Sequence, residues 1–171
     1  MSPTIRFQEV LSRTIYYEGP TSNDPDDPGG PTKMGISTKF LRDLGDDRDA
    51  RDLKELEIFG LYLMHFWDKC DCDKIYSDLI AFKLFDMAVN LGPHTAVKLL
   101  QEAINEVNGA NTIAEDGVIG PITLQYVNNK EHELYILGLL REFQADHYAG
   151  LVLKNPKLQK FINGWTRRAA W

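Results

Sequence analysis

Cysteine is scarce in this sequence, and patterns of metal ligands are missing from it. The two cysteines, Cys70 and Cys72, are separated by a single residue. A disulfide between them would close a small strained ring, and no second Cys or His pair completes a zinc site. The four histidines also lack metal-ligand spacing: His65, His94, His132 and His147. We therefore expect two reduced thiols and no metal site.

Long apolar runs and an excess of basic charge are also absent. No run approaches the roughly 18 residues that a membrane-spanning helix needs. The first residues, MSPTIRFQEV, lack the apolar core and the cleavage site of a secretory signal, so we expect a protein made in a cytoplasm and not exported unaided. The formal net charge of −6 argues against a nucleic-acid binder, which needs a basic stripe. We expect neither membrane insertion nor a nucleic-acid partner.

The sequence does have enough apolar material for a core. Of its 171 residues, 43% are hydrophobic and 26% are charged. This balance suits one compact globular domain, or a domain with a closely packed subdomain. Apolar residues recur with helical spacing along most of the chain, so the sequence predicts a mainly α protein.

Capping residues divide the first half into helices. Ser37 can cap a short helix that Gly45 ends. Asp52 and Glu55 resemble a capping box, and they would begin a long helix. The apolar face of that helix is predicted to contain Leu56, Phe59, Leu63, Phe66 and Trp67. Trp67 could stack on a sugar ring, but a large aromatic residue on an apolar helix face is more often core.

The second half is also predicted to be helical. Ser77 caps a helix that Gly92-Pro93 ends, and Pro121 is placed as the first residue of another helix. A long helix from about Glu131 to Leu153 carries apolar residues around much of its surface, which predicts burial in the core. Asn155-Pro156 then opens the last helix.

An acidic segment rich in proline and glycine, Tyr17–Ser37, is the most unusual stretch. Its prolines and its Gly-Gly pair predict a loop. Apolar periodicity from Ile5 to Ile15 predicts a preceding helix that delivers Glu18 at or near its C-terminal end. A carboxylate there lies at the negative end of the helix dipole, which favours the protonated form that a general acid needs. The other carboxylates of the segment are Asp24, Asp26 and Asp27.

Three interpretations of this segment follow from the residues alone. It can be a solvated surface turn, or a calcium loop built from closely spaced Asp oxygens. It can also be a catalytic loop, because glycoside hydrolysis uses one protonated carboxylic acid and one ionised carboxylate.

The segment resembles the signature of glycoside hydrolase family 108, the N-acetylmuramidase lysozymes, which reads roughly E-G-G-Y-x-x-D-P-x-D-x-G-G-x-T-x-x-G-I. It matches that signature without a gap at Glu18-Gly19, Asp24-Pro25, Asp27, Gly29-Gly30, Thr32 and Gly35-Ile36. It departs from the signature at Pro20, Thr21 and Met34. The order Glu18, Asp27, Thr32 is also similar to the Glu-Asp-Thr set of small phage lysozymes.

Two later blocks extend the resemblance. LFDMAVNLGPHTAVKLLQ places Asp86 and Asn90 one helical turn apart, where both can face one cleft. Asn90 could bond an acetamido group or cap a helix end. The order Leu-Gln, then Asp116-Gly117, Gly120-Pro121 and Thr123 is similar to small helical peptidoglycan-binding domains. A purely structural role for these turn residues is at least as plausible.

The resemblance implies a mainly α, lysozyme-like fold with at most a small hairpin near the active site. A catalytic part, 1–92, and a peptidoglycan-binding-like part, 93–171, are expected to pack as one unit. The implied enzyme is a muramidase that hydrolyses the β-1,4 bond between N-acetylmuramic acid and N-acetylglucosamine. Glu18 would donate the proton, Asp27 would supply the second carboxylate and Thr32 would position a water or the sugar. Substrate-binding roles are expected for Asp24, Asp86 and Asn90.

The implied biology is a monomeric phage endolysin. It would stay in the host cytoplasm until a separate holin-type protein releases it to its partner, bacterial peptidoglycan. Acid–base chemistry of this kind needs no cofactor. The alternatives are a lytic transglycosylase acting on the same bond, and a non-catalytic wall-binding or tail protein. A zinc amidase is disfavoured because the histidines lack ligand spacing.

Overall fold

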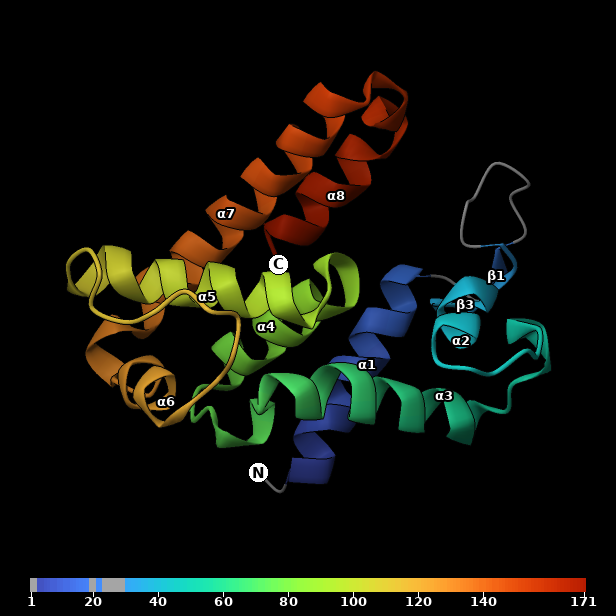
Figure 1. The fold of residues 1–171 in the computed structure, drawn as a ribbon, viewed down its shortest axis with the longest axis horizontal. Coiled ribbons are helices and arrows are strands. Elements are labelled where there is room, and N and C mark those ends of the chain that lie inside the picture. The colour runs from blue at the N-terminus through green and yellow to red at the C-terminus, as the bar shows by residue number, and fades with distance from the viewer. Residues whose placement is uncertain (1–2, 19–20, 23–29) are drawn as a thin grey trace. The chain divides into compact units, whose positions relative to one another are not determined.

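The computed structural model describes the backbone of residues 3–18, 21–22 and 30–171, and the side chains of 5–16 and 30–171. Asp24, Asp26 and Asp27 lie outside the described residues, as does the side chain of Glu18. The fold is mainly α with one small antiparallel sheet, as predicted (Figure 1). The chain divides into two compact units, 1–65 and 66–171. The boundary between these compact units lies before the one expected from the sequence, between residues 92 and 93. The expected division into a catalytic and a peptidoglycan-binding-like part stays a prediction.

The first unit begins with helix α1, Pro3–Glu18. Its buried stripe contains Phe7, Val10, Leu11 and Thr14 at helical spacing. Phe7 packs edge-on against Phe59, with ring centroids 4.8 Å apart. The helix ends at Glu18, so the predicted position of this residue at the C-terminal end of a helix is confirmed.

A three-stranded antiparallel sheet follows α1. Its strands are β1 (Thr21–Ser22), β2 (Thr32–Lys33) and β3 (Ile36–Ser37), in that order. Thr21 pairs with Lys33, and Thr32 pairs with Ser37. The β2–β3 loop consists of Met34 and Gly35, whose φ angles are +48° and +82°. Two positive φ values define the tight hairpin turn that suits the twist of antiparallel strands.

Helix α2, Thr38–Asp43, has the predicted ends. The Ser37 hydroxyl accepts a hydrogen bond from the Phe40 N–H, and Gly45 follows the helix with φ +83°. The charged connection after it contains a short 3-10 helix, η1 (Ala50–Asp52). Ala50 is fully buried, so this charged connection contributes to the core.

The predicted start of the next helix is wrong, and its predicted buried face is right only in part, since Phe66 and Trp67 are buried but Leu56 is not. Helix α3 spans Glu55–Tyr62, and the Glu57 carboxylate, not Glu55, accepts from the backbone N–H of the residue before the helix, Lys54. Leu56 is 80% exposed, whereas Ile58 and Tyr62 are buried. Because apolar residues occupy nearly every side of this segment, periodicity does not single out its buried face. A π-helical turn, η2 (Leu63–Trp67), follows directly and changes the helical phase.

The second unit starts with two short 3-10 helices, η3 (Asp68–Cys70) and η4 (Cys72–Lys74). Both cysteines are buried, and neither of them is part of a disulfide among the described residues. Helix α4, Asp78–Leu91, is capped by the Ser77 hydroxyl, and helix α5, Pro93–Asn108, begins after Gly92. The predicted core position of Trp67 is confirmed, because its side chain is fully buried. The centroids of its ring and the Phe85 ring are 5.8 Å apart.

The remaining helices of this unit are α6 (Pro121–Val127), η5 (Lys130–His132), α7 (Glu133–Lys154), η6 (Pro156–Phe161) and α8 (Ile162–Ala169). Pro121 opens α6 as predicted. Helix α7 packs on α4, α5 and α8, and only one stripe of it is buried, so the predicted burial around the helix is wrong. Leu134, Tyr135 and Leu153 are each at least 72% exposed.

The last predicted helix is interrupted. Asn155 caps η6, not an α-helix, and α8 begins only at Ile162. Trp165 packs back on α7, where its ring stacks on Tyr148 at 4.9 Å between centroids. No helix within the described part of the chain is long and apolar enough to cross a membrane.

Candidate active site

Glu18 comes shortly before the sheet in the chain. Three residues after Glu18, the chain enters β1 at Thr21, which pairs with Lys33 of β2. Ser22 pairs with Thr32, so the segment between these residues, which holds Asp24 and Asp27, leaves and re-enters one sheet. The segment between Ser22 and Thr32 therefore begins and ends in the same sheet. The predicted roles of Asp24 and Asp27 fall outside the described residues.

Thr32 lies on β2 with its side chain half-buried. Its hydroxyl donates a hydrogen bond to the Gly30 carbonyl, 3.1 Å away. Gly30 has φ +71°, as expected for a glycine that turns the chain back into the sheet. Thr32 thus stabilises the return of the acidic segment, and its predicted contact with water or sugar stays a prediction.

A buried threonine anchors this return, and the sequence did not reveal it. Thr38 donates to the Pro31 carbonyl from both its N–H, at 2.9 Å, and its hydroxyl, at 3.0 Å. The same hydroxyl accepts from the Ala50 N–H at 3.0 Å. One side chain therefore ties the end of the acidic segment to the buried η1. A Thr at the start of a helix is common, so no sequence signal marked this one.

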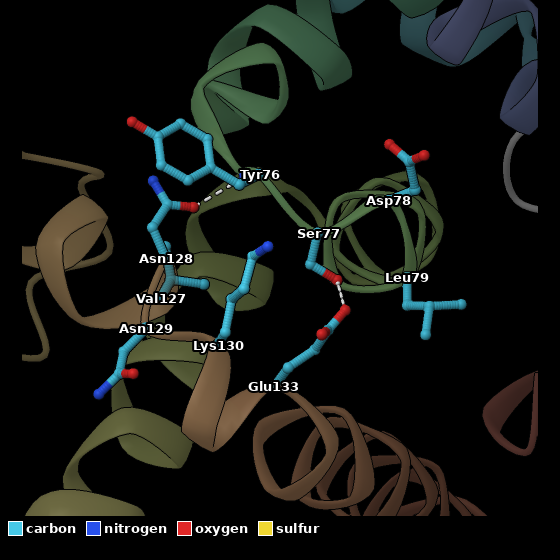
Figure 2. A pocket seen from close by; sticks show the side chains of 9 residues that line it. All are labelled: Tyr76, Ser77, Asp78, Leu79, Val127, Asn128, Asn129, Lys130 and Glu133. Atoms are coloured by element: carbon cyan, nitrogen blue, oxygen red, sulfur yellow. Dashed lines mark hydrogen bonds between the residues drawn. The ribbon is translucent and has the colours of Figure 1, made fainter. Parts of the chain in front are cut away.

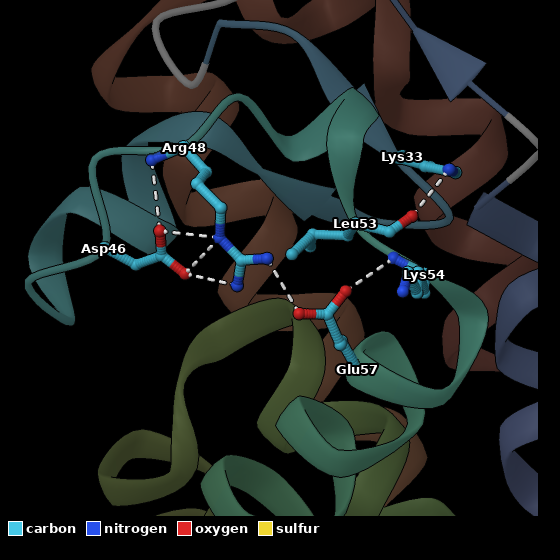
Figure 3. A network of polar contacts seen from close by, with 6 residues as sticks. All are labelled: Lys33, Asp46, Arg48, Leu53, Lys54 and Glu57. Atoms are coloured by element: carbon cyan, nitrogen blue, oxygen red, sulfur yellow. Dashed lines mark hydrogen bonds and ion pairs between the residues drawn. The ribbon is translucent and has the colours of Figure 1, made fainter.

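Lys33 provides a second anchor on β2. Its ammonium donates to the carbonyls of Arg51, at 3.1 Å, and Leu53, at 2.7 Å. Figure 3 shows this contact beside a charged cluster on the same connection. A lysine that donates to two backbone carbonyls fixes the strand to the connection, instead of offering a free charge to a substrate.

The charged cluster consists of Asp46, Arg48 and Glu57 (Figure 3). The Arg48 guanidinium lies 2.8 Å from an Asp46 oxygen and 2.7 Å from a Glu57 oxygen. Hydrogen bonds from Arg48 lower the pKa of Asp46. Hydrogen bonds from the Lys54 N–H and from Arg48 lower the pKa of Glu57. Both carboxylates stay ionised at neutral pH, and the cluster braces the connection that holds Lys33.

Asp86 lies in the core of the second unit. It is fully buried, and its carboxylate accepts from the Arg168 Nε at 2.7 Å and the Gln144 amide at 3.4 Å. This buried ion pair joins α4 to α8 and accounts for an Asp at this position. Asn90 donates to the Asp86 carbonyl at 2.7 Å, in the last turn of α4. Substrate binding by Asp86 and Asn90 stays a prediction that these contacts do not support.

Lys83 is a buried charge that the sequence analysis missed. It is 2% exposed, and its ammonium donates to the carbonyls of Ala169, at 2.8 Å, and Arg168, at 3.3 Å. Burial lowers the pKa of Lys83 to about 8, against the opposing attraction of Asp86. A cation at the end of α8 satisfies carbonyls that the helix leaves open.

The Leu-Gln and Asp-Gly motif of the second half has a structural role. The Gln101 amide donates to Asp116, at 2.8 Å, and accepts from the Gly117 N–H, at 2.8 Å. Gly117 has φ +74°, and a side chain there would meet the His94 ring at 2.2 Å. These residues close a loop against α5, which agrees with the structural interpretation given to them from the sequence.

The fold and the described part of the site define a class. A helix that ends in a Glu, followed directly by a small antiparallel hairpin within a mainly α chain, is the arrangement of a lysozyme-like protein. The described parts of the chain hold no group of three or more metal-ligating side chains.

Comparison with known families identifies the chain more closely. Residues 11–92 match the model of Glycosyl hydrolase 108, and residues 95–170 match the Predicted Peptidoglycan domain. The first part of the chain is therefore a glycosyl hydrolase 108 domain and the second part is a predicted peptidoglycan domain, which confirms the resemblance found in the sequence. The chain is thus a glycoside hydrolase of the peptidoglycan-degrading kind.

Among solved structures, the chain is similar to SagA of Brucella abortus, with 26% identity and a TM-score of 0.80. The match covers 98% of this chain and 91% of that chain. No curated protein sequence matches significantly. The agreement over nearly the whole length includes both compact units.

Proposed function

We propose that this protein is an N-acetylmuramidase, which hydrolyses the β-1,4 bond between N-acetylmuramic acid and N-acetylglucosamine in peptidoglycan. The observation that carries the proposal is the position of Glu18. It is the last residue of α1, three residues before the hairpin, and it lies within the part of the chain that matches the hydrolase family.

In this mechanism Glu18 donates a proton to the glycosidic oxygen as the bond to the sugar breaks. Asp27 is the second carboxylate, which stabilises the oxocarbenium-like transition state or activates a water. Thr32 and Asp24 position the water and the sugar. The pairing of β1 with β2 supports this proposal, because the chain starts and ends the acidic segment in one sheet and enters that sheet three residues after Glu18.

The proposed biological role is that of an endolysin. A monomeric muramidase held in a host cytoplasm until a holin-type protein opens the membrane would degrade the wall at the end of a phage cycle. Expression with and without a membrane-permeabilising protein tests this role, since only co-expression should lyse the host. Lysis by the enzyme alone would contradict it.

Mass spectrometry of digested wall tests the activity. Purified protein should release muropeptides that end in reducing N-acetylmuramic acid. Anhydro-muramic ends would instead identify a lytic transglycosylase, which needs the acid but no water-activating Asp. Sedimentation with the wall without release of any sugar would identify a non-catalytic wall-binding or tail protein.

A further inference from the structure

A pocket of about 330 Å³ opens within the second unit, between the start of α4, the end of α6 and the start of α7 (Figure 2). Its lining includes Tyr76, Ser77, Leu79, Asn129, Lys130 and Glu133. The lining residues at the start of α4 belong to the part of the chain that matches Glycosyl hydrolase 108, and those of α6, η5 and α7 belong to the Predicted Peptidoglycan domain. None of the lining residues is assigned a role by the mechanism above.

Hydrogen bonds between distant segments hold the pocket walls in place. The Asn128 side chain accepts from the Tyr76 N–H, at 2.7 Å, and donates to the Lys74 carbonyl, at 2.9 Å. The Ser77 hydroxyl donates to Glu133, which joins the cap of α4 to the first residue of α7. Figure 2 shows the Tyr76–Asn128 and Ser77–Glu133 hydrogen bonds at opposite sides of the pocket. A ligand entering this pocket would not have to order its walls, which lowers the free-energy cost of binding.

The pocket offers one uncommitted cation beside exposed apolar groups. Among the described residues, the Lys130 ammonium has no hydrogen bond or ion pair, and Figure 2 shows its side chain extending into the pocket. The Tyr76 side chain is 76% exposed and Leu79 is 51% exposed. Glu133 adds a carboxylate within the same lining. The pocket lining therefore presents one ammonium group, the two carboxylates of Asp78 and Glu133, and an apolar surface.

The ligand that suits this combination is a short peptide with carboxylates, an amine and methyl groups. An uncharged amino sugar would leave Lys130 and Glu133 without charged partners, and the Asn128 amide that could bond an acetamido group is already used. The stem peptide of peptidoglycan carries alanine, a glutamate carboxylate and a diamino acid. Its groups complement those of the pocket.

We propose that this pocket binds the stem peptide of peptidoglycan. Lys130 meets a peptide carboxylate, Glu133 meets the amine of the diamino acid, and Tyr76 with Leu79 covers its aliphatic carbons. This inference rests on the proposed function only in taking peptidoglycan as the polymer, and it does not depend on the chemistry of Glu18.

Binding of the tripeptide L-alanyl-γ-D-glutamyl-meso-diaminopimelate to the full chain tests the proposal. This probe contains no glycosidic bond, so calorimetry or NMR titration measures binding without turnover. We expect Lys130→Gln to weaken binding about 1.5-fold to fivefold, the range for one exposed charge pair, and Lys130→Arg to retain it. The difference between wild type and Lys130→Gln should shrink at high salt because the pair is solvent-exposed.

Two substitutions of similar chemistry serve as controls. Lys157→Gln removes an exposed lysine of the same unit outside the pocket, and Tyr135→Ala removes an exposed tyrosine, to be compared with Tyr76→Ala. Only the pocket variants should weaken binding. Equal weakening by the control variants would overturn the proposal, as would tripeptide affinity unchanged by both Lys130→Gln and Tyr76→Ala.

Two further measurements distinguish a failure of this inference from a failure of the proposed function. Chitotetraose, a peptide-free glycan, should not compete with the tripeptide; a chain that binds chitotetraose through Tyr76 and ignores the tripeptide would have a glycan site instead. Release of reducing sugar from whole wall reports on the muramidase separately. Tripeptide binding without sugar release would leave this inference standing and overturn the proposed function.

Discussion

Glu18 is the residue on which the proposed chemistry depends. Its backbone position at the end of α1 follows from the apolar stripe that buries Phe7, Val10 and Leu11 and so fixes the helix. A substitution that keeps the shape of the Glu18 side chain but removes its acidic proton can distinguish a loss of catalysis from a loss of folding.

The first prediction is that Glu18→Gln lowers the rate of wall digestion by at least about 10²-fold, because the amide cannot donate the proton of a general acid. The thermal unfolding midpoint should change little. Turbidity loss of outer-membrane-stripped cells measures the rate, and activity within a few-fold of wild type would refute the assignment.

Asp27 and Asp26 are adjacent carboxylates that the family pattern distinguishes. We predict that Asp27→Asn costs much more activity than Asp26→Asn, because a catalytic carboxylate has to face Glu18 across the scissile bond. The two variants carry the same charge change and serve as each other's control. Equal rates would leave Glu18 as the sole acid and favour the transglycosylase.

The buried Lys83 makes the free energy of unfolding depend on pH between about pH 8 and 10.5. Its pKa is about 8 in the folded protein and 10.5 ordinarily, so the unfolded chain binds more protons between these values. Stability therefore rises with pH in this interval, and the cost of burying the charge is fully present below about pH 8. The free energy of unfolding should rise by on the order of 1–3 kcal/mol between pH 8 and 10.5 in wild type relative to Lys83→Met. Urea denaturation measures it, with exposed Lys98→Met as the control; equal pH dependence in all three proteins would contradict the buried charge.

At the scale of elements, the hairpin connects fold and site. Its sheet pairs only two residues per strand, so its position depends on the anchors at Thr38 and Lys33 and on the Tyr62 hydroxyl, which donates to the Met34 carbonyl at 2.9 Å. A glycine with positive φ, Gly30, returns the acidic segment to β2.

Gly30→Val should lower activity more than stability. Among the described residues other than its chain neighbours, none has an atom within 4 Å of a Cβ added at Gly30, so the expected cost is backbone strain of about 1–2 kcal/mol. That strain acts where the acidic segment re-enters the sheet. Gly45→Val, at φ +83° and also in open space, is a matched control that should lose similar stability but little activity. Similar activity losses in both variants would mean that Gly30 serves the fold alone.

At the scale of the whole molecule, α4, α7 and α8 are joined through one buried ion pair. Arg168→Met leaves the Asp86 carboxylate buried without its guanidinium, and we expect a loss of about 3–5 kcal/mol in the free energy of unfolding. Adding Asp86→Leu should recover much of that loss, since both charges are then gone. Urea denaturation of the single and double variants measures these free energies of unfolding. If Arg168→Met is as stable as wild type, the Asp86–Arg168 ion pair does not contribute to stability.

The sequence by itself determined the helical class, several helix ends and the family. Ser37, Ser77 and Pro121 mark helix starts because capping and proline geometry are local, and they depend on few neighbours. The acidic segment could be recognised for the same reason, since its motif lies within one contiguous stretch.

Only the tertiary structure decided which faces are buried and where the inner charges pair. Leu56 is exposed and Ile58 is buried although both are apolar, because burial depends on which elements pack alongside. Asp86, placed by its motif near a cleft, instead pairs with Arg168, which lies 82 residues further along the chain. Such partners meet only when α4 and α8 pack together, and no local pattern encodes that meeting.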